Sequence, residues 1–245
     1  MDPAPEETAN DAQVPRAVPI AHAFAWYEQA MRLFKRSPFT WCALGFITVA
    51  AELGLQFVPG VGVAIAKIVV PVIECGMIIG AVAVDRGAPL QMRMAIAAFG
   101  AAPGAIAAIV VAALLVFGAE AITAYGIAGV NLLDAGGDDP ALDGTQLTTI
   151  FAVGTLVSLP LSFVPFAALL DNASFARAFA TSARGFMLNV MPMLVFGAMA
   201  LVLVLVGLLS FGIGLIAIFP LLTAASYAAW KDIWAVTDHG VPAAP

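Results

Sequence analysis

Long apolar stretches, separated by short polar or glycine-rich turns, dominate the chain. A basic segment ends at Arg36, and an apolar run follows it to Val58. A Pro-Gly-Val-Gly turn at 59–62 leads into a second apolar run that ends at Val84. A bilayer core of about 30 Å needs roughly 20 apolar residues per helix. Six runs approach this length, at 39–58, 61–84, 103–125, 148–170, 191–211 and 214–230. They are continuous and lack the alternation of barrel strands, so they predict six transmembrane helices.

Amphipathic segments precede three of these runs. Residues 22–36 place Trp26 and Leu33 on one helical face and basic side chains on the other. Segments 89–99 and 172–188 follow the same plan. Such helices lie in the plane of the lipid headgroups. The predicted fold class is therefore an all-α integral membrane protein, with six transmembrane helices arranged as three hairpins, each preceded by a cytoplasmic interfacial amphipathic helix.

An internal repeat relates the first and last of these units. A shift of 152 residues aligns Arg32 with Arg184 and Gly45 with Gly197. The same shift aligns the Gly-x-Gly turn at 60–62 with that at 212–214. Matches in one register predict that both units share a structure, although chance agreement in a Gly- and Ala-rich chain is the alternative.

Composition and charge support this topology. The chain is 62% hydrophobic and 11% charged, whereas soluble domains carry about 25% charged residues. Nine of the ten Lys and Arg residues fall on one side of the predicted helices, Lys67 being the exception. The positive-inside rule makes that side cytoplasmic and places both termini there.

The remaining segments lie outside the predicted membrane domain, 21–236. Residues 1–20 are acidic and proline-rich, lack the apolar core of a signal peptide, and are expected to form a disordered tail. Residues 237–245 form a second tail. A periplasmic loop is predicted at 131–147, and its aspartates leave weak calcium binding open as an alternative, without the spacing of an EF-hand.

Four charged residues fall within predicted spans: Glu52, Lys67, Glu74 and Glu120. An isolated charge at the bilayer centre costs about 2.5–3.5 kcal/mol, so each needs a partner, a water-filled cavity or a neutral state. Glu52 precedes the turn glycine Gly60 by eight residues and Lys67 follows it by seven. At about 1.5 Å rise per residue both lie at the same depth on adjacent helices, which predicts an ion pair. The group is either a polar site for a solute or proton, or a structural pair that sets helix register.

Other chemistry is sparse. The two histidines, His22 and His239, lie at the edges of the tails without a partner at motif spacing. No hydrolase, zinc-protease or nucleotide-loop motif is present. We therefore expect no catalytic residue, no metal site, no cofactor and no nucleic-acid partner.

A further indication comes from the segments Leu33 to Trp41, Pro59 to Gly62, Asp85-Arg86-Gly87, Arg184-Gly185-Phe186 with Asn189 and Pro192, and Ser226 to Ile233. Together they resemble a family of uncharacterised proteobacterial inner-membrane proteins, which implies a location in a bacterial inner membrane. A looser similarity extends to the membrane domain of glycerophosphodiester phosphodiesterases, whose catalytic residues lie in a separate domain. The resemblance implies the topology above and no particular activity.

Two main functional hypotheses follow. The first is a non-enzymatic membrane protein that binds lipid, a protein partner or a second copy of itself. Its basic residues Arg32, Lys35, Arg36, Arg93, Arg177 and Arg184 would face anionic headgroups, or would only set topology. The second is a small transporter or channel that uses the four intramembrane charges. A lipid-modifying enzyme with dispersed carboxylates and arginines is a third alternative.

Overall fold

The computed structural model describes residues 14–133 and 141–236. Within these ranges the chain forms α-helices and two 3-10 segments, and no strand. The elements are α1 (His22–Arg36), α2 (Pro38–Gln56), α3 (Gly62–Asp85), η1 (Met92–Gly100), α4 (Pro103–Ala128), α5 (Gly144–Ser158), η2 (Leu159–Leu161), α6 (Val164–Leu169), α7 (Phe175–Leu188), α8 (Val190–Leu209) and α9 (Leu215–Ile233). The predicted all-α class is confirmed for the described residues.

Five segments are long and apolar enough to cross a membrane: α2, α3, α4, the stretch Gly144–Leu169 and α8. They are compatible with a multi-pass membrane protein. The expected sixth span, α9, does not reach the same standard. Its last turn contains Lys231 and Asp232, which lower its mean hydropathy.

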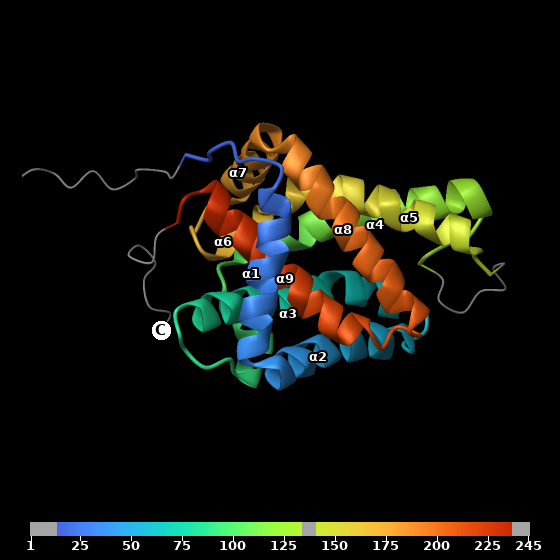
Figure 1. Ribbon diagram of the computed structural model, residues 1–245. Helices are drawn as coiled ribbons and strands as arrows, with labels where there is room; N and C mark the ends of the chain where they lie inside the picture. The colour runs from blue at the N-terminus through green and yellow to red at the C-terminus, as the bar shows by residue number, and fades with distance from the viewer. Residues whose placement is uncertain (1–13, 134–140, 237–245) are drawn as a thin grey trace, which may run out of the picture.

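The long helices follow one another around a closed circle. Each contacts the next along the chain, from α2 to α3, α4, α5, α8 and α9, and α9 contacts α2 again. Figure 1 shows α1, η1, α7 and both ends of the described chain in the left half of the view. We call this the basic end. The links 57–61 and 210–214 lie at the opposite end, which we call the turn end.

Large aromatic side chains fill the basic end. Trp26, Trp41 and Phe163 are at most 1% exposed. The Phe163 ring lies edge-on to Trp234, with ring centroids 5.0 Å apart. Burial of one such side chain stabilises a fold by about 3 kcal/mol. The hydrophobic core is therefore concentrated where α1, α2, α3 and α9 meet.

The predicted internal repeat is present in the structure. Shifting α1 and α2 by 152 residues gives 174–188 and 190–208, which match the bounds of α7 and α8 within one residue. Buried positions match as well. Trp26 and Leu33 of α1 correspond to buried Ala178 and Gly185 of α7. The two turns also agree, because Gly60 and Gly212 have φ of 76° and 80°, in the region that favours glycine.

Five further expectations, about the N-terminal tail, one loop and the course of three helical segments, need correction. The tail predicted over 1–20 is wrong for residues 14–20. The Arg16 N–H donates to the Ile233 carbonyl at 2.8 Å, and the Val18 N–H donates to Asn189 Oδ1 at 2.8 Å. These partners are distant in sequence, so composition alone does not reveal them. Residues 1–13 and 237–245 lie outside the described chain.

The helix predicted over 89–99 is instead the 3-10 segment η1, which begins at Met92. Its buried residues Ala95 and Ala98 are three apart, the repeat of a 3-10 helix. A Cβ at Gly76 of α3 would lie 2.0 Å from the Met94 carbonyl oxygen. The backbone of η1 is thus pressed directly onto α3, and this contact replaces the expected amphipathic α-helix.

The loop predicted over 131–147 ends earlier, because α5 begins at Gly144. The Asp143 carboxylate accepts a hydrogen bond from the Gln146 N–H at 2.8 Å, and the Gln146 side chain accepts one from the Asp143 N–H at 3.0 Å. This capping box starts the helix inside the expected loop. The aspartates at 134, 138 and 139 lie outside the described residues.

The span predicted over 148–170 is not continuous. It is divided into α5, η2 and α6. Pro160 and Pro165 each lack a backbone N–H, and a proline ring inside a helix clashes with the carbonyl four residues earlier. The helix predicted over 172–188 begins at Phe175, because Asn172 has a φ of 48° and the chain reverses there.

Candidate functional site

The candidate site is the set of four charged side chains Glu52, Lys67, Glu74 and Glu120, which we call the charge cluster. Glu52 lies in the last turns of α2, and Lys67 in the second turn of α3. Glu74 lies two turns further along α3, and Glu120 is on α4. All four are half-buried. Three neighbouring helices therefore contribute to one polar region within an otherwise apolar part of the bundle.

An ion pair joins α2 to α3. The Lys67 ammonium donates to Glu52 Oε1, and each side chain is about a quarter exposed, at 26% and 25%. Gln56 Nε2 donates to the same oxygen at 3.4 Å. The pairing predicted from equal depth about the Gly60 turn is thus confirmed. A tight turn leaves little freedom of register, which is why counting residues from it located the contact.

Lys67 also contacts α4. Its Nζ lies 5.2 Å from the centroid of the Phe117 ring, within the range of a cation–π interaction. Phe117 precedes Glu120 by three residues, so both occupy neighbouring positions on one face of α4. Phe117 was not predicted from the sequence, although its position three residues before Glu120 would have placed it on the same face of the helix. The lysine is therefore held between a carboxylate on one helix and an aromatic face on another.

Glu120 lies against α5. A Cβ at Gly154 would lie 2.1 Å from Glu120 Oε1, so a larger residue there would displace this carboxylate from its position. The group that packs against Gly154 is thus the Glu120 carboxylate. The charge cluster is consequently in contact with four helices, from α2 to α5.

Carboxylates outnumber the lysine in the charge cluster. Lys67 and Glu52 interact electrostatically with both Glu74 and Glu120. Among the described residues, neither Glu74 nor Glu120 forms a salt bridge of its own. If all four groups were ionised the formal charge would be −2, one positive against three negative groups. The surplus attracts cations or protons.

The turn end around the charge cluster is less tightly packed than the basic end. Residues 116–121 of α4 are all half-buried, and so are residues 214–219 at the start of α9. Six residues cover more than one helical turn of 3.6 residues. A helix packed on one side would show a buried stripe and an exposed stripe over such a length. Neighbouring helices therefore do not bury any face of these two segments completely.

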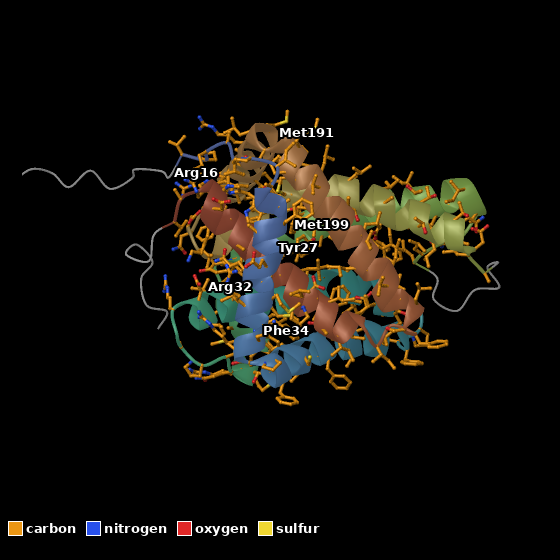
Figure 2. All side chains as sticks on the ribbon, viewed as in Figure 1. Arg16, Tyr27, Arg32, Phe34, Met191 and Met199 are labelled. Atoms are coloured by element: carbon orange, nitrogen blue, oxygen red, sulfur yellow. The ribbon has the colours of Figure 1, made fainter. Side chains whose placement is uncertain are left out.

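The six predicted headgroup-facing residues are all exposed and occur on α1, η1 and α7. Arg32 pairs with Glu28 at 2.6 Å, and Arg36 donates to the Val84 carbonyl at 2.8 Å. Figure 2 shows Arg16 and Arg32 in the left part of the view, where the basic end lies. The structure thus groups these cations at one end of the bundle and keeps them away from the charge cluster.

Sequence analysis missed a polar hub at the basic end. The Asp232 carboxylate accepts hydrogen bonds from Arg16 at 2.6 Å and from Trp26 at 2.9 Å, and pairs with His22 at 2.6 Å. Burial raises the pKa of Asp232, but the hydrogen bonds from His22, Trp26 and Arg16 lower it by more, so the net pKa lies below the ordinary aspartate value. An open hollow of about 400 Å³ adjoins this hub. The hub fastens the N-terminal segment to α9.

Comparison of the chain with protein-family models, with curated proteins and with solved structures finds no match. The resemblance to a family of bacterial inner-membrane proteins therefore stays an expectation from the quoted residues.

Proposed function

We propose that this multi-pass membrane protein is a small carrier or channel for a cation or for protons, which bind at the charge cluster. The observation that carries the proposal is the surplus of carboxylates there, because Glu74 and Glu120 lie beside the Glu52–Lys67 pair and form no salt bridge of their own with any described residue. Ionisable residues inside a membrane are expensive and commonly mark pathways for ions or protons. The incompletely packed helices around the cluster give a route to it from the turn end.

The chemistry of binding follows from the charges. An arriving cation or proton neutralises one of the surplus carboxylates, Glu74 or Glu120. Lys67 is then free to shift between Glu52 and the other acids, since all of them lie within electrostatic range. Two unit charges 4 Å apart interact by about 4 kcal/mol at an effective dielectric constant of about 20, so occupancy by a ligand alters the balance of the whole cluster.

The proposed topology has six spans, with α9 as the sixth. The Arg16 N–H bonds to the Ile233 carbonyl, so the two ends of the described chain lie at the same end of the bundle. A chain that starts and finishes on one side crosses an even number of times. The grouping of basic residues at that end supports a cytoplasmic location for both termini in a bacterial inner membrane.

Flux into liposomes tests the proposal. Purified protein is reconstituted, and the decay of imposed proton, Na⁺ and K⁺ gradients is compared with that in empty liposomes. We expect Glu120→Gln and Glu74→Gln to slow the decay by about tenfold, the factor that corresponds to 1.4 kcal/mol. Glu28→Gln is the matched control, because Glu28 is an exposed carboxylate on α1 at the other end. Gradients that decay no faster than in empty liposomes would overturn the proposal.

Variants of the Glu52–Lys67 pair distinguish a role in transport from a purely structural role. Lys67→Met should abolish flux while the fold remains intact. The double variant Glu52→Gln with Lys67→Met removes both charges and therefore leaves no unpaired partner. If that double variant is as stable and as active as the parent, the pair is only structural and Lys67 has no part in transport.

A second candidate function is the binding of anionic lipid at the basic end. Exposed cations there lie beside exposed apolar side chains, such as Phe24 on α1, Ile96 on η1 and Met187 on α7. This mixture suits the boundary between headgroups and acyl chains. Native mass spectrometry in a gentle detergent tests it. A stoichiometric phosphatidylglycerol or cardiolipin adduct that is lost when the six cations are neutralised supports it, and equal retention of phosphatidylcholine contradicts it.

A further inference from the structure

The stretch Gly144–Leu169, long enough to span a membrane, is interrupted near its basic end. The α-helical pattern stops at Ser158, continues as the short 3-10 segment η2, and resumes at Val164. Backbone groups at such an interruption lose their partners within the helix, and inside a membrane they must find others. At this interruption, the hydrogen-bond partners of these backbone groups must come from outside the helix.

One side chain from another element does so. Ser182 of α7 is fully buried. Its hydroxyl donates to the Pro160 carbonyl at 2.7 Å and accepts from the Phe163 N–H at 3.0 Å. Both hydrogen bonds run between α7 and the interruption. The interruption is therefore closed by a neighbour that can be displaced, whereas a continuous helix closes its own hydrogen bonds.

The buried face of α7 allows this close approach to residues 159–163. Its positions Ala178, Ser182 and Gly185 are all small. A Cβ at Gly185 would lie 2.2 Å from the Trp234 ring, so α7 also rests directly on the end of α9. Asn189, at the end of α7, holds the N-terminal segment by donating to the Arg16 carbonyl at 2.9 Å. The position of α7 is thus tied to both ends of the described chain.

The other side of the interruption leads to the charge cluster. Gly154 lies on α5 six residues before Pro160, and the Glu120 carboxylate packs against it. A change in the tilt of α5 about the interruption would move Gly154 relative to Glu120. A physical path therefore runs from α7, through Ser182 and the interruption, to the carboxylate.

We propose that residues 159–163 form a hinge, latched by Ser182, about which α5 tilts against α4 to open or close access to Glu120. The hinge itself rests on the geometry above, and its role in access rests on the proposed cation or proton function. Discontinuous membrane helices with backbone groups satisfied by neighbouring segments are able to move as two rigid halves. Release of Ser182 frees the half that contacts the charge cluster.

Hydrogen–deuterium exchange of the protein in lipid nanodiscs tests the latch. We expect Ser182→Ala to raise the exchange of peptides covering 159–164 by about tenfold. Ser162→Ala is the matched control, because the Ser162 hydroxyl donates to the Ser158 carbonyl within the same segment. It should change exchange far less. Equal exchange in Ser182→Ala and the parent, or an equal rise in both variants, would overturn the latch.

A distance measurement tests the movement without any ligand. Spin labels are attached at exposed Leu53 of α2 and Leu156 of α5, on a chain whose Cys42 and Cys75 are replaced by alanine. Figure 1 shows these two helices on opposite sides of the bundle. Ser182→Ala should broaden the distance distribution and shift it by about 2 Å or more. An unchanged distribution would show that α5 does not tilt, and would overturn the hinge.

The two proposals fail in distinguishable ways. A shifted distance without any flux in the parent would retain the hinge and discard transport. A shifted distance with parental flux would show that the hinge does not govern access to Glu120, and would overturn that part. If Ser182→Ala does not fold, Pro160→Ala gives the converse test. It restores a backbone N–H, and it should narrow the distance distribution and slow exchange at 159–164. Parental exchange and distances in Pro160→Ala would then overturn the hinge.

Discussion

The basic end and the turn end of this bundle are stabilised by different means. At the basic end, aromatic side chains such as Trp41 and Phe163 are fully buried, the Phe163 ring packs against Trp234, and charges are paired around Asp232 and Asp85. At the turn end, residues 116–121 and 214–219 are half-buried throughout, and Glu74 and Glu120 form no salt bridge within the part of the chain that the structure describes. The comparison teaches that the tightest packing and the surplus of carboxylates occupy separate halves of the molecule. Each prediction below therefore pairs a change at one end with a matched change elsewhere.

The largest difference is expected for aromatic truncation. Trp41 is fully buried and donates a hydrogen bond to the Leu33 carbonyl at 3.3 Å, whereas Phe57 at the turn end is 86% exposed. Trp41→Ala should lower the free energy of unfolding by about 3–5 kcal/mol. Phe57→Ala should change it by about 0.5 kcal/mol or less. Thermal unfolding in detergent measures both, and similar losses would remove the distinction between the two ends.

A smaller difference is expected for glycine substitution. A Cβ at Gly76 meets the backbone of η1, but a Cβ at Gly118 of α4 has no atom within 4 Å. Gly76→Ala should cost about 1–3 kcal/mol through overpacking. Gly118→Ala should gain up to about 1 kcal/mol from helix propensity. The same unfolding assay applies, and a tolerated Gly76→Ala would show that η1 is not pressed onto α3 as described.

The smallest effect concerns pH. The pKa of Asp232 is lowered in the folded state, so its ionised form stabilises the fold. This contribution is complete above the ordinary aspartate pKa of about 3.9 and is lost as pH falls through the lower folded value. Asp232→Asn should therefore cost about 1 kcal/mol at pH 7 and make stability less sensitive to acid below pH 4. Unfolding measured at pH 7 and at pH 3.5 checks this, with Glu28→Asn as an exposed control. A parental pH profile in Asp232→Asn would assign the acid sensitivity to other groups.

Sequence reasoning succeeded where contacts are local or the register is fixed by a turn. The bounds of α1 match the predicted segment 22–36, because they follow from amphipathic spacing. The Glu52–Lys67 pair followed from counting residues on either side of Gly60. The repeat was visible because glycines at turns and close contacts have few substitutes.

Sequence reasoning failed where partners are remote and chemically ordinary. Arg16 and Asp232 are 216 residues apart, and nothing in either neighbourhood signals the contact. Pro160 was read as part of a continuous span, because prolines are tolerated in membrane helices when neighbours satisfy the freed groups. That neighbour is Ser182, which contributes a single hydroxyl group. The sequence-based interpretation of its helix rested on the basic residues, so Ser182 was not singled out. Periodicity reports which face of a helix is buried, and it carries no information about which remote element covers it.

The packing of α1 on α9 has a consequence for biosynthesis. The first helix of the described chain to leave the ribosome packs mainly on the last, so its apolar face, with Trp26 and Leu33, is not fully covered until α9 has been made. During that interval the lipid surface is the available shelter for this face. A chain that stalls before residue 215 would keep it uncovered indefinitely, and would expose an apolar signal that membrane quality-control proteases can recognise. Coverage of the apolar face of α1, near the start of the chain, thus depends on whether the end of the chain has been made.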